Sequence, residues 1–292
     1  MANPVLRLVT EQRLRVMVWA SLISQILIVV TGGAVRLTGS GLGCPTWPSC
    51  TEDSLVNVPE MGIHGLIEFG NRLLTFVLLL IAVLTLVAAI ASGKSRKLRS
   101  TSVWLIFGIF LQAVVGGISV LANLNPWIVG LHFVISGFMI AVATLQMWRA
   151  YKPEISPFPK VETRLARLLL LAGSLTVLVG VVVTGSGPHA GDAATPRNGL
   201  DAELWQHYHS YPAYVSLALA LVLLFIVRRR DVDGYASRLV FWTTLCLLAQ
   251  AVTGIVQSRL GLPVQIVIVH LTLASIFISL LTFVQLAYGK RK

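Results

Sequence analysis

Eight long apolar segments constrain the fold more than any other feature of this chain. A run of about twenty apolar residues is what an α-helix needs to cross the hydrocarbon core of a bilayer. Because 55% of the 292 residues are apolar and only 12% are charged, we expect an all-α, multi-pass membrane protein. The predicted transmembrane helices cover residues 17–35, 64–91, 102–122, 127–148, 165–185, 205–227, 239–258 and 264–286.

The net charge of +11 would suit a nucleic-acid-binding protein, but the positions of the basic residues argue against that function. Nineteen of the 23 Lys and Arg residues lie in the two tails and in the connecting segments 94–99, 149–167 and 228–238. With eight spans these segments share one side of the membrane, which the positive-inside rule makes the cytoplasm. We therefore expect cytoplasmic termini, membrane lipid around the protein and no nucleic acid as a partner.

The sequence also repeats itself at an offset of 138 residues. The segment 112–132 begins Gln-Ala-Val-Val-Gly and ends in histidine, and the segment 250–270 begins Gln-Ala-Val-Thr-Gly and ends in histidine. Each half holds four spans, and an even number gives both halves the same orientation, so we expect two parallel four-helix-bundle repeats. The predicted domains are an amino-terminal half at 1–150, a cytoplasmic joint at 151–163 and a carboxy-terminal half at 164–292.

Histidines at matching positions of the two halves indicate a cofactor. The even-numbered spans run in the same direction, so His64, His132, His209 and His270 share the outer part of the membrane. Imidazoles at one depth suit a flat haem held between helices, with one nitrogen at each axial position of the iron. His209 and His270 form a complete pair. In the first half Asn71 aligns with His209, so that iron site would be weaker, open, or completed by His64.

The second span and the loop before it add a carboxylate and two thiols. Ionisable residues inside spans are costly and usually functional, which makes Glu68 a candidate catalytic residue. It would otherwise be solvated at the outer mouth or paired with Arg72. Cys44 and Cys50 lie in the first outer loop, where an oxidising environment favours a disulfide. That pair would either brace the loop or exchange with a thiol partner.

Together these motifs resemble the haem A synthase family, also called the Cox15/CtaA family. The resemblance rests on Gly-Cys-Pro-Thr-Trp-Pro-Ser-Cys at 43–50, on Glu-Phe-Gly-Asn-Arg at 68–72 and on the repeated glutamine-to-histidine segments, and it covers essentially the whole chain. It implies an oxidoreductase of the bacterial plasma membrane that oxidises the C8 methyl group of haem O to a formyl group by successive hydroxylations, giving haem A. The family's usual motif in the second span is Glu-x-x-His-Arg, and here Asn71 replaces the histidine.

The same resemblance implies roles for individual residues. Haem b would bind between His209 and His270, with both histidines as iron ligands. The substrate, haem O, would bind in the amino-terminal half with His132 as its iron ligand, near Glu68. Glu68 would remove a proton or position water near the methyl carbon. Haem O synthase and an electron acceptor are the implied protein partners.

Two other functions fit part of the same sequence. A bis-histidine membrane cytochrome that relays electrons between quinone and a partner would explain the histidines, but not Glu68 or the cysteine loop. A transporter built from parallel repeats would use Glu68 and His132 as a proton relay. Bound haem argues against the transporter, and conversion of haem O separates the enzyme from the cytochrome.

Overall fold

A computed structural model describes residues 4–153, 158–230 and 234–289. These residues form eight helices that are long and apolar enough to cross a membrane, as the sequence predicts. A short 3-10 helix, η1, precedes the second of them. The bounds are α1 Pro4–Leu37, η1 Pro59–Met61, α2 Gly62–Ala91, α3 Arg96–Leu121, α4 Pro126–Tyr151, α5 Lys160–Ser186, α6 Ala202–Arg229, α7 Tyr235–Arg259 and α8 Val264–Tyr288.

The helices extend beyond the predicted spans, mostly at ends rich in basic residues. Helix α1 begins at Pro4 rather than at residue 17, and α3 begins at Arg96 rather than at residue 102. Hydropathy marks only the part of a helix that suits hydrocarbon, whereas Lys and Arg are good helix formers that continue the helix outside it. The predicted sidedness of these ends stays a prediction.

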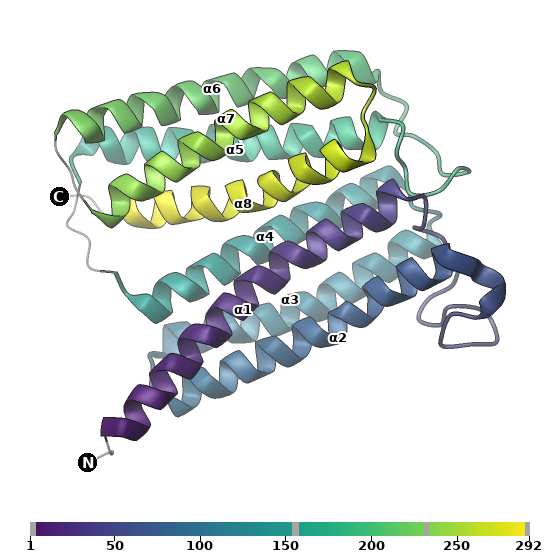
Figure 1. The fold of residues 1–292 in the computed structure, drawn as a ribbon, viewed down its shortest axis with the longest axis horizontal. Helices are drawn as coiled ribbons and strands as arrows, with labels where there is room; N and C mark the ends of the chain where they lie inside the picture. The colour runs from purple at the N-terminus through teal and green to yellow at the C-terminus, as the bar shows by residue number, and fades with distance from the viewer. Residues whose placement is uncertain (1–3, 154–157, 231–233, 290–292) are drawn as a thin grey trace. The chain divides into compact units, whose positions relative to one another are not determined.

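The described residues fall into two compact units, and each contains four long helices (Figure 1). In the first unit α1 and α3 both pack against α2 and α4, so the four helices form a closed ring. In the second unit α5 and α7 both pack against α6 and α8 in the same way. The units comprise the described residues of Met1–Lys152 with Pro188–Asn198, and of Pro153–Gly187 with Gly199–Lys292.

The segment 188–198 packs within the first unit, although it lies in the predicted carboxy-terminal half. The Gly41 amide donates to the Gly191 carbonyl oxygen at 2.8 Å, and Arg36 Nε donates to the His189 carbonyl oxygen at 2.7 Å. A Cβ on Gly41 would lie only 3.1 Å from the Gly191 oxygen, so a side chain there would be a tight fit. The predicted joint at 151–163 lies partly outside the described residues, at 154–157, and the domain boundaries stay predictions.

The turns that precede α4 and α8 have the same backbone pattern. Asn123 and Leu124 have φ of 50° and 56°, and Gly261 and Leu262 have φ of 74° and 62°. Each pair of residues in the left-handed conformation lies just before the proline at the start of the next helix. These turns return the chain so that α3 and α4, and likewise α7 and α8, lie antiparallel and in contact.

Candidate functional site

The second unit brings two of the predicted ligands together. His209 on α6 and His270 on α8 face each other across the four-helix ring. The centroids of their imidazoles are 6.5 Å apart, and the imidazole planes are inclined at 72°. A separation of this size accommodates two metal–nitrogen bonds of about 2 Å together with the radii of the two rings. The pair therefore has the spacing that an iron between two imidazoles requires.

The hydrogen bonds of the two rings leave the correct nitrogen free for a metal. His209 Nδ1 lies 3.0 Å from the Thr176 carbonyl oxygen, which can only accept, so Nδ1 carries the proton. His270 Nδ1 lies 3.1 Å from the Thr253 hydroxyl, which donates its own proton to the Ala249 carbonyl oxygen. His270 Nδ1 is therefore also the donor, and both rings present an unprotonated Nε2 of the kind a metal ligand needs.

Each ring also lies against a glycine of the neighbouring helix. A Cβ on Gly180 of α5 would be 2.9 Å from His209 Cε1, and a Cβ on Gly254 of α7 would be 3.3 Å from His270 Cε1. A side chain at Gly180 would require a shift of the His209 ring, and one at Gly254 would press tightly on the His270 ring. With the ring nitrogens fixed and the rings packed on glycine, the second unit fits a haem held by both histidines.

The first unit reproduces part of this arrangement around His132. Gln112 Nε2 donates to the His132 carbonyl oxygen at 3.1 Å, as Gln250 Nε2 does to that of His270 at 3.2 Å. A Cβ on Gly116 of α3 would lie 3.2 Å from His132 Cε1. The predicted ligand of the first half therefore has the same backbone anchor and the same glycine contact as its counterpart.

His132 differs from His270 in the partner of its Nδ1. That atom is buried and meets no hydrogen-bond partner among the described residues. At the offset of 138 the position of Thr253 is taken by Val115, which has no hydroxyl to offer. The orientation of the His132 ring therefore rests on packing rather than on a hydrogen bond.

His64 lies apart from these ligands, at the start of α2. Its Nδ1 is 2.8 Å from Ser40 Oγ, and the residue is exposed. The loop crosses so closely that a Cβ on Gly43 would lie 2.2 Å from the His64 carbonyl oxygen, which leaves room only for glycine. In this structure His64 joins the outer loop to α2.

Glu68 is buried and fully engaged by its surroundings. Arg72, one turn on in α2, contacts Glu68 Oε1 through Nη2 at 2.6 Å and through Nε at 3.1 Å. The Cys44 amide donates to Glu68 Oε2 at 2.6 Å. Of the interpretations that the sequence allowed, the pairing with Arg72 is the one present here, and the carboxylate also holds the outer loop.

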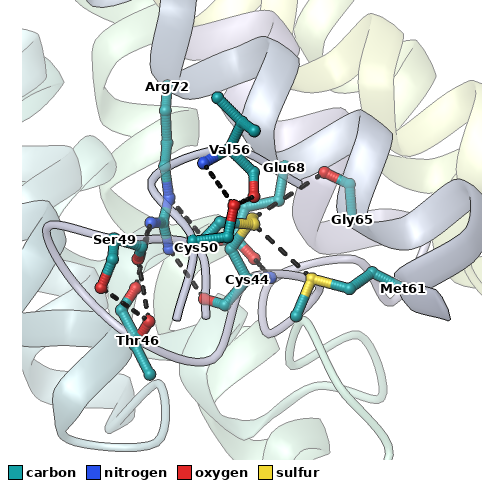
Figure 2. Close-up of a disulfide and its surroundings, with 10 residues drawn as sticks. Cys44, Thr46, Ser49, Cys50, Val56, Met61, Gly65, Glu68 and Arg72 are labelled. Carbon is teal, nitrogen blue, oxygen red and sulfur yellow. Dashed lines mark hydrogen bonds and ion pairs between the residues drawn. A yellow bond between two sulfur atoms is a disulfide. The ribbon is translucent and has the colours of Figure 1, made fainter. Parts of the chain in front are cut away.

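The outer loop is closed by the Cys44–Cys50 disulfide and anchored by Arg72 (Figure 2). The guanidinium group reaches from α2 into the loop and donates to the carbonyl oxygens of Cys44, Thr46 and Ser49 at 2.8, 3.0 and 3.1 Å. One arginine thus satisfies a carboxylate and three carbonyl groups that face inward. The disulfide, Arg72 and Glu68 form a single anchor for the loop.

The anchored loop places an indole against α3 next to the His132 contact. A Cβ on Gly117 would lie 2.3 Å from Trp47 Cδ2, so Trp47 packs directly on the glycine that follows Gly116. We expect Gly117→Ala to destabilise the protein by about 1–3 kcal/mol, because the loop must shift to admit the methyl group. Thermal unfolding in detergent measures this loss.

Gly70→Ala is the matched control for that variant. A Cβ on Gly70, within α2, would meet nothing within 4 Å. The substitution should therefore leave the stability unchanged or raise it by about 0.5–1 kcal/mol through helix propensity. Equal effects of the two substitutions would contradict the packing of Trp47 on Gly117.

The sequence profile of the COX15-CtaA family, described as cytochrome oxidase assembly protein, matches residues 15–282 of this chain. This chain belongs to the COX15-CtaA family. The matched range contains every residue of the two histidine sites and the whole outer loop. The resemblance stated from the sequence is thereby confirmed.

Relatives of this COX15-CtaA chain are similar over nearly their whole length. The Heme A synthase of Listeria welshimeri is 28% identical over 295 residues, which covers 94% of this chain and 96% of the relative. The Heme A synthase of Staphylococcus epidermidis is 25% identical over 292 residues, covering 92% and 93%. That of Halalkalibacterium halodurans is 25% identical over 288 residues, covering 92% and 95%.

Sequence reasoning missed several residues that support the sites of this family member. Thr176 and Thr253 fix the histidine tautomers, and Trp47 joins the loop to α3. Thr253 lies within the repeated segment 250–270, so its replacement by valine in the first half was a visible signal. Thr176 and Trp47 had no such signal, because Thr176 contributes only its backbone carbonyl group, which any residue has, and Trp47 packs on a helix far away in sequence.

Proposed function

We propose that this protein is a haem A synthase, an oxidoreductase that converts the C8 methyl group of haem O to a formyl group. The observation that carries the proposal is membership of the COX15-CtaA family over residues 15–282. Similarity to proteins named Heme A synthase over 92–94% of the chain supports it. Two hydroxylations of the methyl carbon, each a two-electron oxidation whose electrons would pass to the proposed electron acceptor, would give a hydrate that loses water to form the aldehyde.

We propose that the second unit holds haem b through His209 and His270. Haem b, when bound, supplies a one-electron carrier. The spacing of the two rings, their unprotonated Nε2 atoms and the hydrogen bond of Thr253 support this assignment. A haem that both histidines held would suit electron transfer rather than binding of a substrate at the iron.

We propose that the first unit binds the substrate, haem O, with His132 as its ligand and Glu68 as the catalytic residue. The matching anchors of His132 and His270 support the ligand assignment. Glu68 would accept a proton or orient water near the methyl carbon, as the sequence predicts. To do so it must exchange one of its hydrogen bonds with Arg72 or Cys44, since both oxygens are engaged. His64 remains a less direct candidate ligand because it binds Ser40.

The proposed arrangement in the cell follows from the charge pattern and the repeat. The chain would lie in the bacterial plasma membrane with both termini in the cytoplasm. It would consist of two parallel four-helix repeats, 1–150 and 164–292, joined at 151–163. The recurring closed rings of helices support that division. Haem O synthase, as donor of the substrate, and an electron acceptor are the proposed partners.

A bis-histidine cytochrome that relays electrons is the second candidate function. The geometry of His209 and His270 favours it, because two axial ligands are what an electron carrier uses. It gives no role to His132, to Glu68 or to the loop that Arg72 anchors. Conversion of haem O decides between the two functions.

The proposal is tested by producing the protein together with a haem O synthase in a host that lacks haem A. We expect extracted haems to include haem A or a hydroxylated intermediate for the unaltered protein. We expect neither product for His132→Ala or Glu68→Ala, because the first removes the proposed ligand and the second the catalytic carboxylate. Separation of the haems by chromatography gives the result.

The control for Glu68→Ala is Glu60→Ala, which removes an exposed carboxylate in η1 and should leave product formation unchanged. Thermal unfolding of each variant separates a catalytic role of Glu68 from its role in holding the loop. Loss of product with unchanged stability assigns catalysis, and a parallel loss of both assigns positioning. Haem b alone from the unaltered protein would overturn the synthase and leave the cytochrome.

A further inference from the structure

The first unit has an amide where the second unit has an iron ligand. At the offset of 138, Asn71 on α2 takes the position of His209 on α6. Helix α2 stands diagonally across its ring from α4, which carries His132, as α6 stands across from α8 with His270. Asn71 thus lies on the helix from which the second ligand of a haem would come, and it is too short and too weak a ligand for iron.

The side chain of Asn71 occupies the packing position of an imidazole without filling it. A Cβ on Gly32 of α1 would lie 3.9 Å from Asn71 Nδ2, whereas a Cβ on Gly180 of α5 would lie 2.9 Å from the His209 ring. The contact joins the first and second helices of each unit, α1 and α2 in one and α5 and α6 in the other. Asn71 thus lies at an ordinary contact distance from α1, with room for a methyl group at Gly32.

A pocket of about 260 Å³ opens beside this asparagine, between α1 and α2. An engineered cavity of about 150 Å³ is enough to hold a benzene ring, so a five-membered ring fits here. The Thr31 hydroxyl donates to the Ile28 carbonyl oxygen at 3.2 Å and is already used. The pocket is lined by Thr31, Ala34, Val35, Ile67, Asn71 and Leu74.

The amide oxygen of Asn71 gives the pocket a specific polar preference. Asn71 Oδ1 is buried and meets no donor within the part of the chain that the structure describes. A buried acceptor without a partner is unfavourable, and a ligand that offers an N–H or O–H group would satisfy it. The apolar walls exclude charged ligands, since the transfer of an unpaired ion into such a site is costly.

His64 does not take the place of the missing ligand in this arrangement. It lies two helical turns before Asn71, a rise of about 10 Å, and its Nδ1 is held by the buried Ser40 hydroxyl. The exposed ring belongs to the contact between the outer loop and α2. Asn71 therefore marks the position at which the second unit has a histidine and the described residues of the first unit bring none.

We propose that the Asn71 pocket binds a small neutral molecule with an N–H or O–H donor, on the side of the substrate haem opposite His132. Asn71 Oδ1 accepts a hydrogen bond from the N–H or O–H group of this ligand. A different atom of the ligand faces the iron of the bound haem. Water is the smallest molecule of this class, and imidazole is the probe that the pocket can hold. This inference rests on the proposed function, because it needs haem at His132.

The test is a titration of the purified, haem-loaded ferric protein with imidazole, followed by its visible absorption spectrum. We expect one population, the haem lost in His132→Ala, to change from high spin to low spin as imidazole binds. Asn71→Leu should weaken the imidazole affinity about tenfold, because it removes the hydrogen bond and narrows the pocket. Asn71→His should be low spin from the start and give no response.

His209→Asn is the matched control, since it places the same amide at the equivalent position of the second unit. It should create a second haem population that responds to imidazole. A His132-dependent haem that is low spin without imidazole, or that ignores it, overturns the pocket while leaving the synthase proposal intact. If no haem depends on His132, the proposed substrate site fails instead, and the two failures are therefore distinct.

Discussion

If the second unit holds haem b as proposed, His270→Ala should abolish its low-spin spectrum. The substitution removes one of two imidazoles whose centroids lie 6.5 Å apart, so an iron between them keeps only His209. Loss of an axial ligand converts a six-coordinate iron to an open one and lowers haem retention by more than the 10–100-fold typical of a change outside the ligand shell. Absorption spectroscopy and the haem content of the purified protein measure both effects.

Thr253→Val serves as a milder change than His270→Ala, and His207→Ala serves as a control without effect. Thr253→Val mimics the first unit, where Val115 stands at this position, and removes the hydroxyl that accepts from His270 Nδ1. It should keep the low-spin spectrum but weaken haem retention by about 10–100-fold. His207 is exposed two residues before His209, so His207→Ala should change nothing. A haem content in His270→Ala equal to that in His207→Ala would remove His270 from the site.

The sequence predicted those elements whose cause is local. A helix that crosses a bilayer is set by its own hydropathy, so all eight helices were expected at the right places. The histidine pair was expected because His270 recurs as His132 in the repeat and His209 lies at a matching depth on another span. Helix ends were less well predicted, since polar residues past the hydrocarbon limit leave the apolar pattern while the helix continues, as α1 does toward Pro4.

The partners of the outer loop could not be predicted in the same way. The choice of Glu68 and Arg72 as a pair was open, because the spacing of four residues allows the contact without requiring it. That Arg72 also binds three loop carbonyl groups depends on the loop's conformation, which sequence periodicity does not encode. The contact of the segment 188–198 with Gly41 was unexpected for the same reason, since it joins residues 150 positions apart.

Arg72→Met should be among the most destabilising single substitutions in the first unit. It leaves the Glu68 carboxylate, only 7% exposed, without its counter-charge, and it removes the donor of three carbonyl groups. Removing one partner of a buried ion pair costs about 3–5 kcal/mol, which is more than the intact pair itself contributes to stability. Thermal unfolding in detergent should show this loss, and haem A formation should fall with it.

Two comparisons identify the cause of that loss. Lys94→Met breaks the Lys94–Glu11 pair, whose side chains are 22% and 37% exposed, and should cost no more than about 1 kcal/mol. The double variant Glu68→Met with Arg72→Met should be more stable than Arg72→Met alone, because it removes the isolated charge as well. The spectrum of the haem b proposed for the second unit should persist in all of them, because its proposed ligands, His209 and His270, and their hydrogen-bond partners lie on other helices. If Arg72→Met proved as mild as Lys94→Met, Arg72 could not be the anchor of the disulfide loop, and the position of Trp47 on Gly117 would have to be maintained by the disulfide and the loop's own turns.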